Sequence, residues 1–133
     1  MADSKLTETS LRSPLGRVRG LGSAKEGVSH WWAQRVTAVA LVPLTLWFVF
    51  SIAVMAGAEH AAVRAWIAAP FNTVLLVLLV AATFHHAQLG LQVVIEDYIH
   101  AEGAKLVWLL LMKGLCLLLG LTAILSILRI AFA

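Results

Sequence analysis

Three long apolar stretches, almost free of charge, constrain this chain more than any other feature. No charged residue lies between Arg35 and Glu59, and further apolar runs follow Pro70 and Lys105. A helix rises 1.5 Å per residue, so about 20 apolar residues cross the roughly 30 Å hydrocarbon core of a bilayer. The sequence therefore predicts an all-α integral membrane protein with three transmembrane helices, at about residues 31–56, 70–98 and 106–130, forming part of a larger helix bundle.

Basic residues gather before and at the start of the first span. They are six of the ten lysines and arginines in a chain of net charge +3, namely Lys5, Arg12, Arg17, Arg19, Lys25 and Arg35. Basic flanks of this kind mark the cytoplasmic side of a membrane helix, and they do not form a stripe that would bind nucleic acid. We predict a polar basic segment at 1–27 and a membrane domain at 28–133, with the N-terminus on the cytoplasmic or matrix side.

The second span carries two adjacent histidines, His85 and His86, in its middle. Ionisable groups at this depth are costly and therefore need a partner. An imidazole can ligate haem iron through one nitrogen while the other donates a hydrogen bond, but a hydrogen bond to a neighbouring helix would also satisfy it. Gly90 lies one turn beyond His86 and leaves room there for a flat macrocycle. Periodicity alone barely separates the two histidines.

The second span ends in Asp97 and Tyr98. The Tyr98 phenol could donate a hydrogen bond to a quinone carbonyl, with Asp97 influencing the proton supply. Tyr98 could equally be an interfacial aromatic residue at a solvated helix end. For the neighbouring Glu96 and Glu102 we expect only the solvated role.

Two basic side chains also fall inside predicted spans. Arg35 follows Trp31 and Trp32, as a snorkelling arginine beside interfacial tryptophans would, yet its guanidinium could also pair with haem propionates. Lys113 lies about 12 Å into the third span by helical rise, so we expect it to snorkel or to meet a partner carboxylate.

Several of these residues stand in runs that resemble the small cytochrome b membrane-anchor subunit of succinate dehydrogenase, respiratory complex II. The runs are HWWAQRV at 30–36, LVPL at 41–44 and HAQLGLQVVIEDYIH at 86–100. The resemblance extends from about residue 27 to the C-terminus. Its most specific part is a histidine, a glycine four residues later and Asp-Tyr at the helix end.

The resemblance implies a role for each candidate residue. His86 would be an axial ligand of haem b, with the second ligand from a larger cytochrome b anchor subunit. Tyr98 would hydrogen-bond ubiquinone beside Asp97, and Arg35 would lie near the haem propionates and the quinone pocket. The chain would anchor the iron–sulfur and flavoprotein subunits at the inner membrane of a bacterium or mitochondrion. Succinate oxidation would then take place in those other subunits, and no residue here would catalyse it.

Composition limits the chemistry that this chain can host alone. It has a single cysteine, Cys116, and no glycine-rich dinucleotide fingerprint, so it is not expected to hold a cysteine-ligated cluster or the flavin itself. Two alternatives remain at this point. One is the anchor of a fumarate reductase, which has the same architecture, and the other is a membrane scaffold without redox chemistry.

Overall fold

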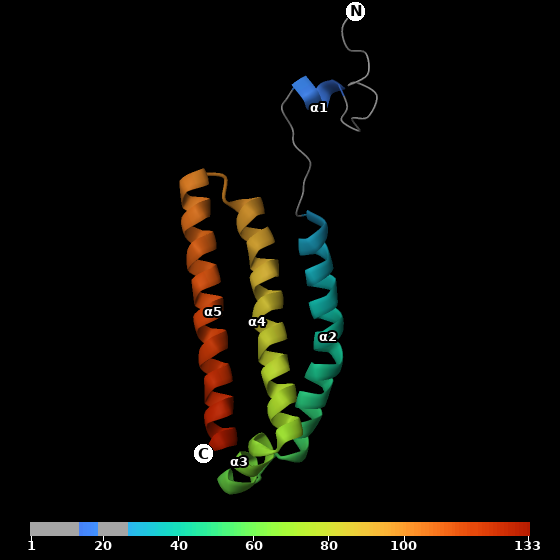
Figure 1. The fold of residues 1–133 in the computed structure, drawn as a ribbon, viewed down its shortest axis with the longest axis vertical. Coiled ribbons are helices and arrows are strands. Elements are labelled where there is room, and N and C mark those ends of the chain that lie inside the picture. The colour runs from blue at the N-terminus through green and yellow to red at the C-terminus, as the bar shows by residue number, and fades with distance from the viewer. Residues whose placement is uncertain (1–13, 19–26) are drawn as a thin grey trace, which may run out of the picture.

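The computed structural model describes residues 14–18 and 27–133. Three long helices, α2 (Gly27–Val54), α4 (Pro70–Tyr98) and α5 (Glu102–Phe132), lie side by side with α4 in the middle (Figure 1). All three are long and apolar enough to cross a membrane. The predicted all-α fold with three spans is therefore confirmed, although α2 begins and ends earlier than expected and α5 is longer at both ends.

Much of the predicted N-terminal segment lies outside the described residues. Of 1–27, the structure describes the short helix α1 (Pro14–Val18) and Gly27, which already belongs to α2. The predicted boundary between a polar segment and a membrane domain at about residue 27 stays a prediction. The described residues support this boundary in one respect, because the first membrane helix, α2, begins at Gly27.

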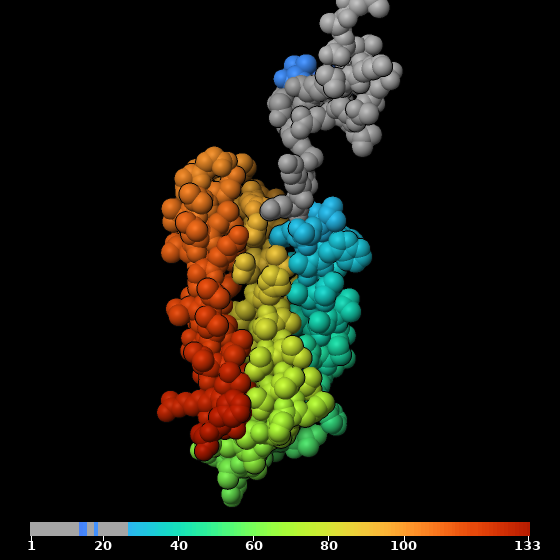
Figure 2. Space-filling model, viewed as in Figure 1, coloured from blue at the N-terminus to red at the C-terminus, as the bar shows by residue number. Residues whose placement is uncertain are grey.

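The three long helices form an open row. α4 contacts both α2 and α5, whereas α2 and α5 do not contact each other within the described part of the chain. In the space-filling view, α4 remains visible between the outer helices along its length (Figure 2). No residue of α2 is buried, so both faces of the row are available to lipid or to another membrane chain.

The contact between α4 and α5 depends on residues spaced by one helical turn. Met112, Cys116 and Gly120 are the buried residues of α5, and this spacing of four places them on one face. A Cβ atom at Gly120 would lie 3.3 Å from Cγ of Phe84 on α4. Gly120 therefore permits the helices to approach closely, as small residues do at membrane helix interfaces.

Replacing Gly120 with leucine is expected to destabilise the packing of α4 on α5 by about 1–3 kcal/mol, because the added atoms overfill a close contact. Thermal unfolding of the purified protein in mild detergent would measure the loss. Gly114 is the matched control on the same helix, since a Cβ there would meet nothing within 4 Å. Equal melting temperatures for Gly120→Leu and Gly114→Leu would contradict the prediction.

The first loop contains a helix that the sequence pattern did not predict, α3 (His60–Ala68). Val63, Trp66 and Ile67 are among its half-buried residues and follow the i, i+3, i+4 pattern of a helix with one packed face. The Trp66 ring stacks on Trp47 of α2, with centroids 5.6 Å apart. The helical pattern in this loop is too short to be recognised from the sequence. Helices of this length are stabilised by such packing rather than by their own helix propensity.

Helix α4 starts where α3 ends. Pro70 takes its first position, where a missing N–H costs no helical hydrogen bond. The side chains of Asn72 and Thr73 donate to the carbonyls of Trp66 and Ile67, at 2.8 Å and 2.7 Å. The Thr73 bond satisfies a carbonyl that the end of α3 leaves free, whereas the Trp66 carbonyl also accepts from the Ala69 N–H. Together the two side-chain bonds fix the start of α4 against the end of α3.

Candidate functional site

His86 is half-buried and faces α2. Its Nδ1 lies 2.9 Å from Oγ1 of Thr37. Nε2 has no hydrogen-bond partner among the described residues, and it is not one of the fully buried atoms that lack one. One ring nitrogen is thus held by the protein while the other remains open.

The adjacent His85 points to a different neighbour. It is exposed and, with Phe84 and Cys116, lines a cleft of about 200 Å³ between α4 and α5. A rotation of about 100° per residue accounts for the divergence of His85 and His86. The structure therefore separates two histidines that periodicity could barely distinguish, placing one toward each flanking helix.

The space left by Gly90 adjoins α2 and is not empty. A Cβ at Gly90 would lie 3.6 Å from Nε2 of Gln34, an ordinary contact distance. Oε1 of Gln34 and Nε2 of nearby His30 are both buried without a hydrogen-bond partner in the described part of the chain. A macrocycle on this face would have to share its room with the Gln34 amide, which is a constraint that the sequence pattern did not predict.

The donor set fits a haem that is shared between two chains. Within residues 14–18 and 27–133 there is no cluster of three or more His, Cys, Asp or Glu side chains that could hold a metal ion. The described chain could supply an iron with one imidazole, that of His86, whose Nδ1 is hydrogen-bonded and whose Nε2 has no partner. That combination suits one axial position of a haem, whose ligating histidine normally has its other nitrogen hydrogen-bonded.

Arg35 is exposed on α2, and its guanidinium lies over the Trp31 ring, with Cζ 5.4 Å from the ring centroid. This is a cation–π contact of the kind expected for an arginine among interfacial tryptophans. Arg35 precedes Thr37 by two residues, so the two side chains leave the helix about 200° apart. The single chain does not bring Arg35 and His86 together.

Asp97 and Tyr98 are both exposed at the end of α4, and Tyr98 is 80% exposed. Neither side chain has a hydrogen bond to another described residue. Asp97 lies about 20° from His86 around the helix, whereas Tyr98 lies about 120° away. Both remain free to meet a ligand or partner, but they do not form an enclosed pocket by themselves.

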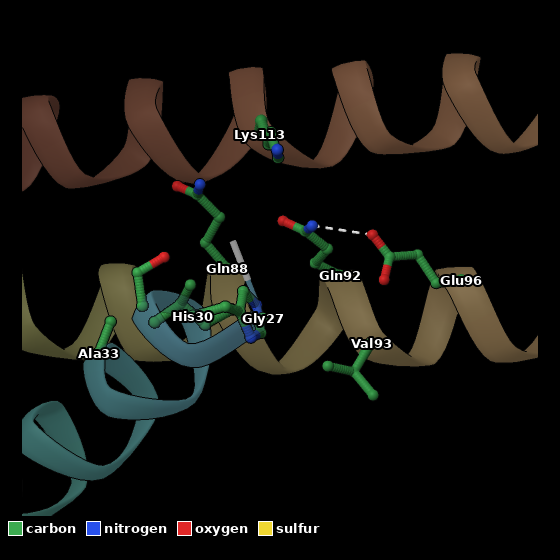
Figure 3. Close-up of a pocket in the computed structure, with 10 residues that line it drawn as sticks. Gly27, His30, Ala33, Gln88, Gln92, Val93, Glu96 and Lys113 are labelled. Carbon is green, nitrogen blue, oxygen red and sulfur yellow. Dashed lines mark hydrogen bonds between the residues drawn. The ribbon is translucent and has the colours of Figure 1, made fainter. Parts of the chain in front are cut away.

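A polar cleft at this end of the membrane domain was missed. Gln88, Gln92 and Glu96 recur every four residues on α4 and line a cleft of about 630 Å³ with Lys113 of α5 and the start of α2 (Figure 3). Nε2 of Gln92 donates to Oε1 of Glu96 at 2.8 Å. The i, i+4, i+8 spacing could have revealed this stripe, but Glu96 was expected only to be solvated.

Lys113 lines the same cleft and is exposed. Glu96 lies across that cleft, yet the ion pair found in the described residues is the short-range one between Lys105 and Glu102, at 2.9 Å. The predicted alternatives for Lys113, snorkelling or a carboxylate from a partner, both stay open.

Taken together, the open row of three spans and the outward-facing polar groups define a class, the small helical membrane subunit of a larger assembly. Residues 9–128 match the family described as succinate dehydrogenase/fumarate reductase transmembrane subunit, and the chain belongs to that family.

Individual relatives agree with this assignment. The chain is 36% identical over 88 residues to a succinate dehydrogenase hydrophobic membrane anchor subunit of Rickettsia bellii, covering 66% of this chain and 70% of the relative. It is 30% identical over 107 residues to the protein of the same description in Rickettsia conorii, covering 80% and 85%. For that of Paracoccus denitrificans, the identity is 36% over 93 residues, covering 70% and 72%. The resemblance noted in the sequence is thereby confirmed.

Proposed function

We propose that this chain is the small anchor subunit of a succinate:ubiquinone oxidoreductase. It holds the flavoprotein and iron–sulfur subunits at the inner membrane, shares haem b with a larger cytochrome b anchor subunit, and forms part of the ubiquinone site. The observation that carries the proposal is His86, half-buried in the middle of a span with one nitrogen partnered and one open. Because the relatives above are succinate dehydrogenase subunits, succinate oxidation is favoured over fumarate reduction.

His86 presents a neutral imidazole nitrogen to the iron and so adds no net charge to the membrane interior. When bound, haem b would accept and release one electron at a time. This chain would hold the haem iron through His86, and the larger anchor subunit would supply the other protein ligand. Arg35 would neutralise a propionate from the outer side of α2, where its guanidinium is exposed and able to form a bidentate pair.

Tyr98 and Asp97 would form this chain's part of the quinone site. The Tyr98 phenol donates a hydrogen bond to a quinone carbonyl, and the Asp97 carboxylate accepts or returns a proton beside it. Both side chains are exposed at the end of α4, so the remaining walls of the site come from partner subunits. This division accounts for two polar residues that no described neighbour satisfies.

The open row of helices suits an anchoring role. The apolar side chains along α2 and α5 are mostly exposed, which is favourable only against lipid or another apolar surface. One face of the row would pack on the larger anchor subunit, and the remaining surface would contact lipid tails. The polar end of α4 would then meet the water-soluble subunits.

Purification of the tagged full chain from its own membranes in mild detergent tests the proposal. Flavoprotein and iron–sulfur subunits are expected to co-purify, with a reduced-minus-oxidised spectrum typical of a low-spin haem b. A colourless protein without these partners would instead support the membrane scaffold.

The proposed orientation makes a separate prediction. In a Cys116→Ser background, Ala58→Cys in the first loop should react with an impermeant maleimide in right-side-out membrane vesicles. Ala101→Cys in the second loop should react only in inverted vesicles, because the distribution of basic residues predicts a cytoplasmic or matrix-side location for that loop. Both alanines are exposed, so the outcome depends on their side of the membrane. The opposite labelling pattern would contradict the proposed orientation and show that the two loops lie on the reverse sides of the membrane.

A further inference from the structure

The hydrogen bond between Thr37 and His86 joins α2 to α4 at the candidate haem ligand. Its two atoms, Thr37 Oγ1 and His86 Nδ1, are 2.9 Å apart. Both residues are half-buried, so water competes little for either group. Which atom donates is decided by the other contacts of the hydroxyl.

The Thr37 hydroxyl has a single proton, and the preceding turn of its own helix offers the nearest acceptors. Oγ1 lies 2.7 Å from the carbonyl oxygen of Ala33 and 3.1 Å from that of Gln34. With its proton directed to the Ala33 carbonyl, Oγ1 turns a lone pair toward His86. Nδ1 must then be the donor, which leaves the lone pair of a neutral imidazole on Nε2.

Nε2 is also the open nitrogen. It has no hydrogen-bond partner in the described part of the chain and is not fully buried. The tautomer that Thr37 selects is therefore the one that can bind a metal through the accessible atom. A histidine with its proton on Nε2 would first have to exchange tautomer before it could ligate iron through Nε2.

We propose that Thr37 is the positioning residue of the haem ligand. It accepts the Nδ1–H bond of His86, holds the ring in one tautomer and orientation, and makes Nε2 a stronger electron donor. The inference rests on the proposed function, in which His86 ligates haem b. A partner of this kind typically changes metal affinity by about 10–100-fold.

Thr37→Val tests the inference in the purified complex, because valine nearly matches threonine in shape but cannot accept a hydrogen bond. Two readouts are independent of turnover, namely the haem midpoint potential and the rate of haem transfer to apomyoglobin. The potential is expected to rise, since a weaker donor stabilises ferric iron less, and haem transfer is expected to become about tenfold faster. Thr37→Ser, which keeps the hydroxyl, should restore both values.

Thr45 provides a matched control on the same helix. Its hydroxyl makes the same pair of backbone contacts, 2.7 Å to the Leu41 carbonyl and 3.1 Å to that of Val42, but it is exposed and does not meet a histidine. Thr45→Val should leave the potential and the haem transfer rate unchanged. An equal shift in Thr45→Val would mean that loss of the backbone contact is responsible, and the inference would fail.

Other outcomes are equally decisive. Wild-type potential and haem retention in Thr37→Val would overturn the role of Thr37, as would a shift that Thr37→Ser does not reverse. If Thr37→Val prevents assembly of the complex, Thr37→Cys is the second variant, because its sulfur is only a weak hydrogen-bond acceptor. A raised haem midpoint potential in Thr37→Cys supports the inference, and an unchanged potential overturns it. If His86→Ala retains haem, the proposed ligand itself is wrong, which is a different failure from an unaffected Thr37→Val.

Discussion

Replacing His86 with alanine is expected to abolish the haem b absorption of the assembled complex. Alanine supplies no axial ligand, and the described residues contain no metal-binding cluster that could replace the imidazole. The measurement is a reduced-minus-oxidised spectrum of the purified complex, together with quantification of each subunit. Because the iron loses a ligand outright, we expect the effect on haem content to exceed that of Thr37→Val.

His85→Ala is the matched control for this experiment. His85 is the neighbouring residue at nearly the same depth, but it faces the cleft toward α5 and not Thr37. This variant is expected to keep the haem spectrum. A full haem signal in His86→Ala with all subunits present would reject the assignment, and loss of signal in His85→Ala alone would transfer it to His85.

Tyr98→Phe is expected to reduce quinone reductase turnover by about tenfold or more. Loss of one hydrogen bond that leaves its partner unsatisfied costs about 1–3 kcal/mol, and about 1.4 kcal/mol corresponds to a factor of ten. Phenylalanine keeps the ring at the membrane interface, so only the phenol is tested. Turnover should be measured with a ubiquinone analogue over a range of concentrations.

Two comparisons separate a quinone defect from a general one. Succinate oxidation with an electron acceptor that bypasses the quinone should be unchanged in Tyr98→Phe. Trp108→Phe alters another exposed aromatic residue near the start of α5, and it should have little effect on quinone turnover. If Tyr98→Phe keeps normal turnover and quinone affinity, Tyr98 is an interfacial anchor and nothing more.

The positions of the three spans could be predicted because charge is nearly forbidden in hydrocarbon. The uncharged stretch after Arg35 and the proline at the start of α4 were sufficient to place helices to within a few residues. The nine residues of α3 were not recognised, because a helix this short is stabilised mainly by its packing. For α3, that packing includes the stack of Trp66 on Trp47 of α2.

The polar cleft shows a different limit. Gln88, Gln92 and Glu96 share a face by their spacing, so their alignment was present in the sequence. The position of Lys113 on the opposite side of the same cleft could not be predicted from the sequence, because the rotation of α5 against α4 depends on close packing at Gly120. From the sequence alone, Glu96 was therefore expected only to be solvated at the end of its helix, and Lys113, inside the third span, was expected to snorkel or to meet a partner carboxylate.

For the candidate site itself, the amino-acid pattern identified a histidine in mid-span, a glycine one turn away and an Asp-Tyr helix end, since all of these follow from spacing along one helix. The pattern could not say which neighbour each histidine faces. That depends on how α4 is rotated between two other helices, which places His86 against Thr37 and His85 toward α5. Contacts between helices distant in sequence are set by packing, and in this chain they determine which nitrogen of His86 is hydrogen-bonded to Thr37 and which has no partner among the described residues.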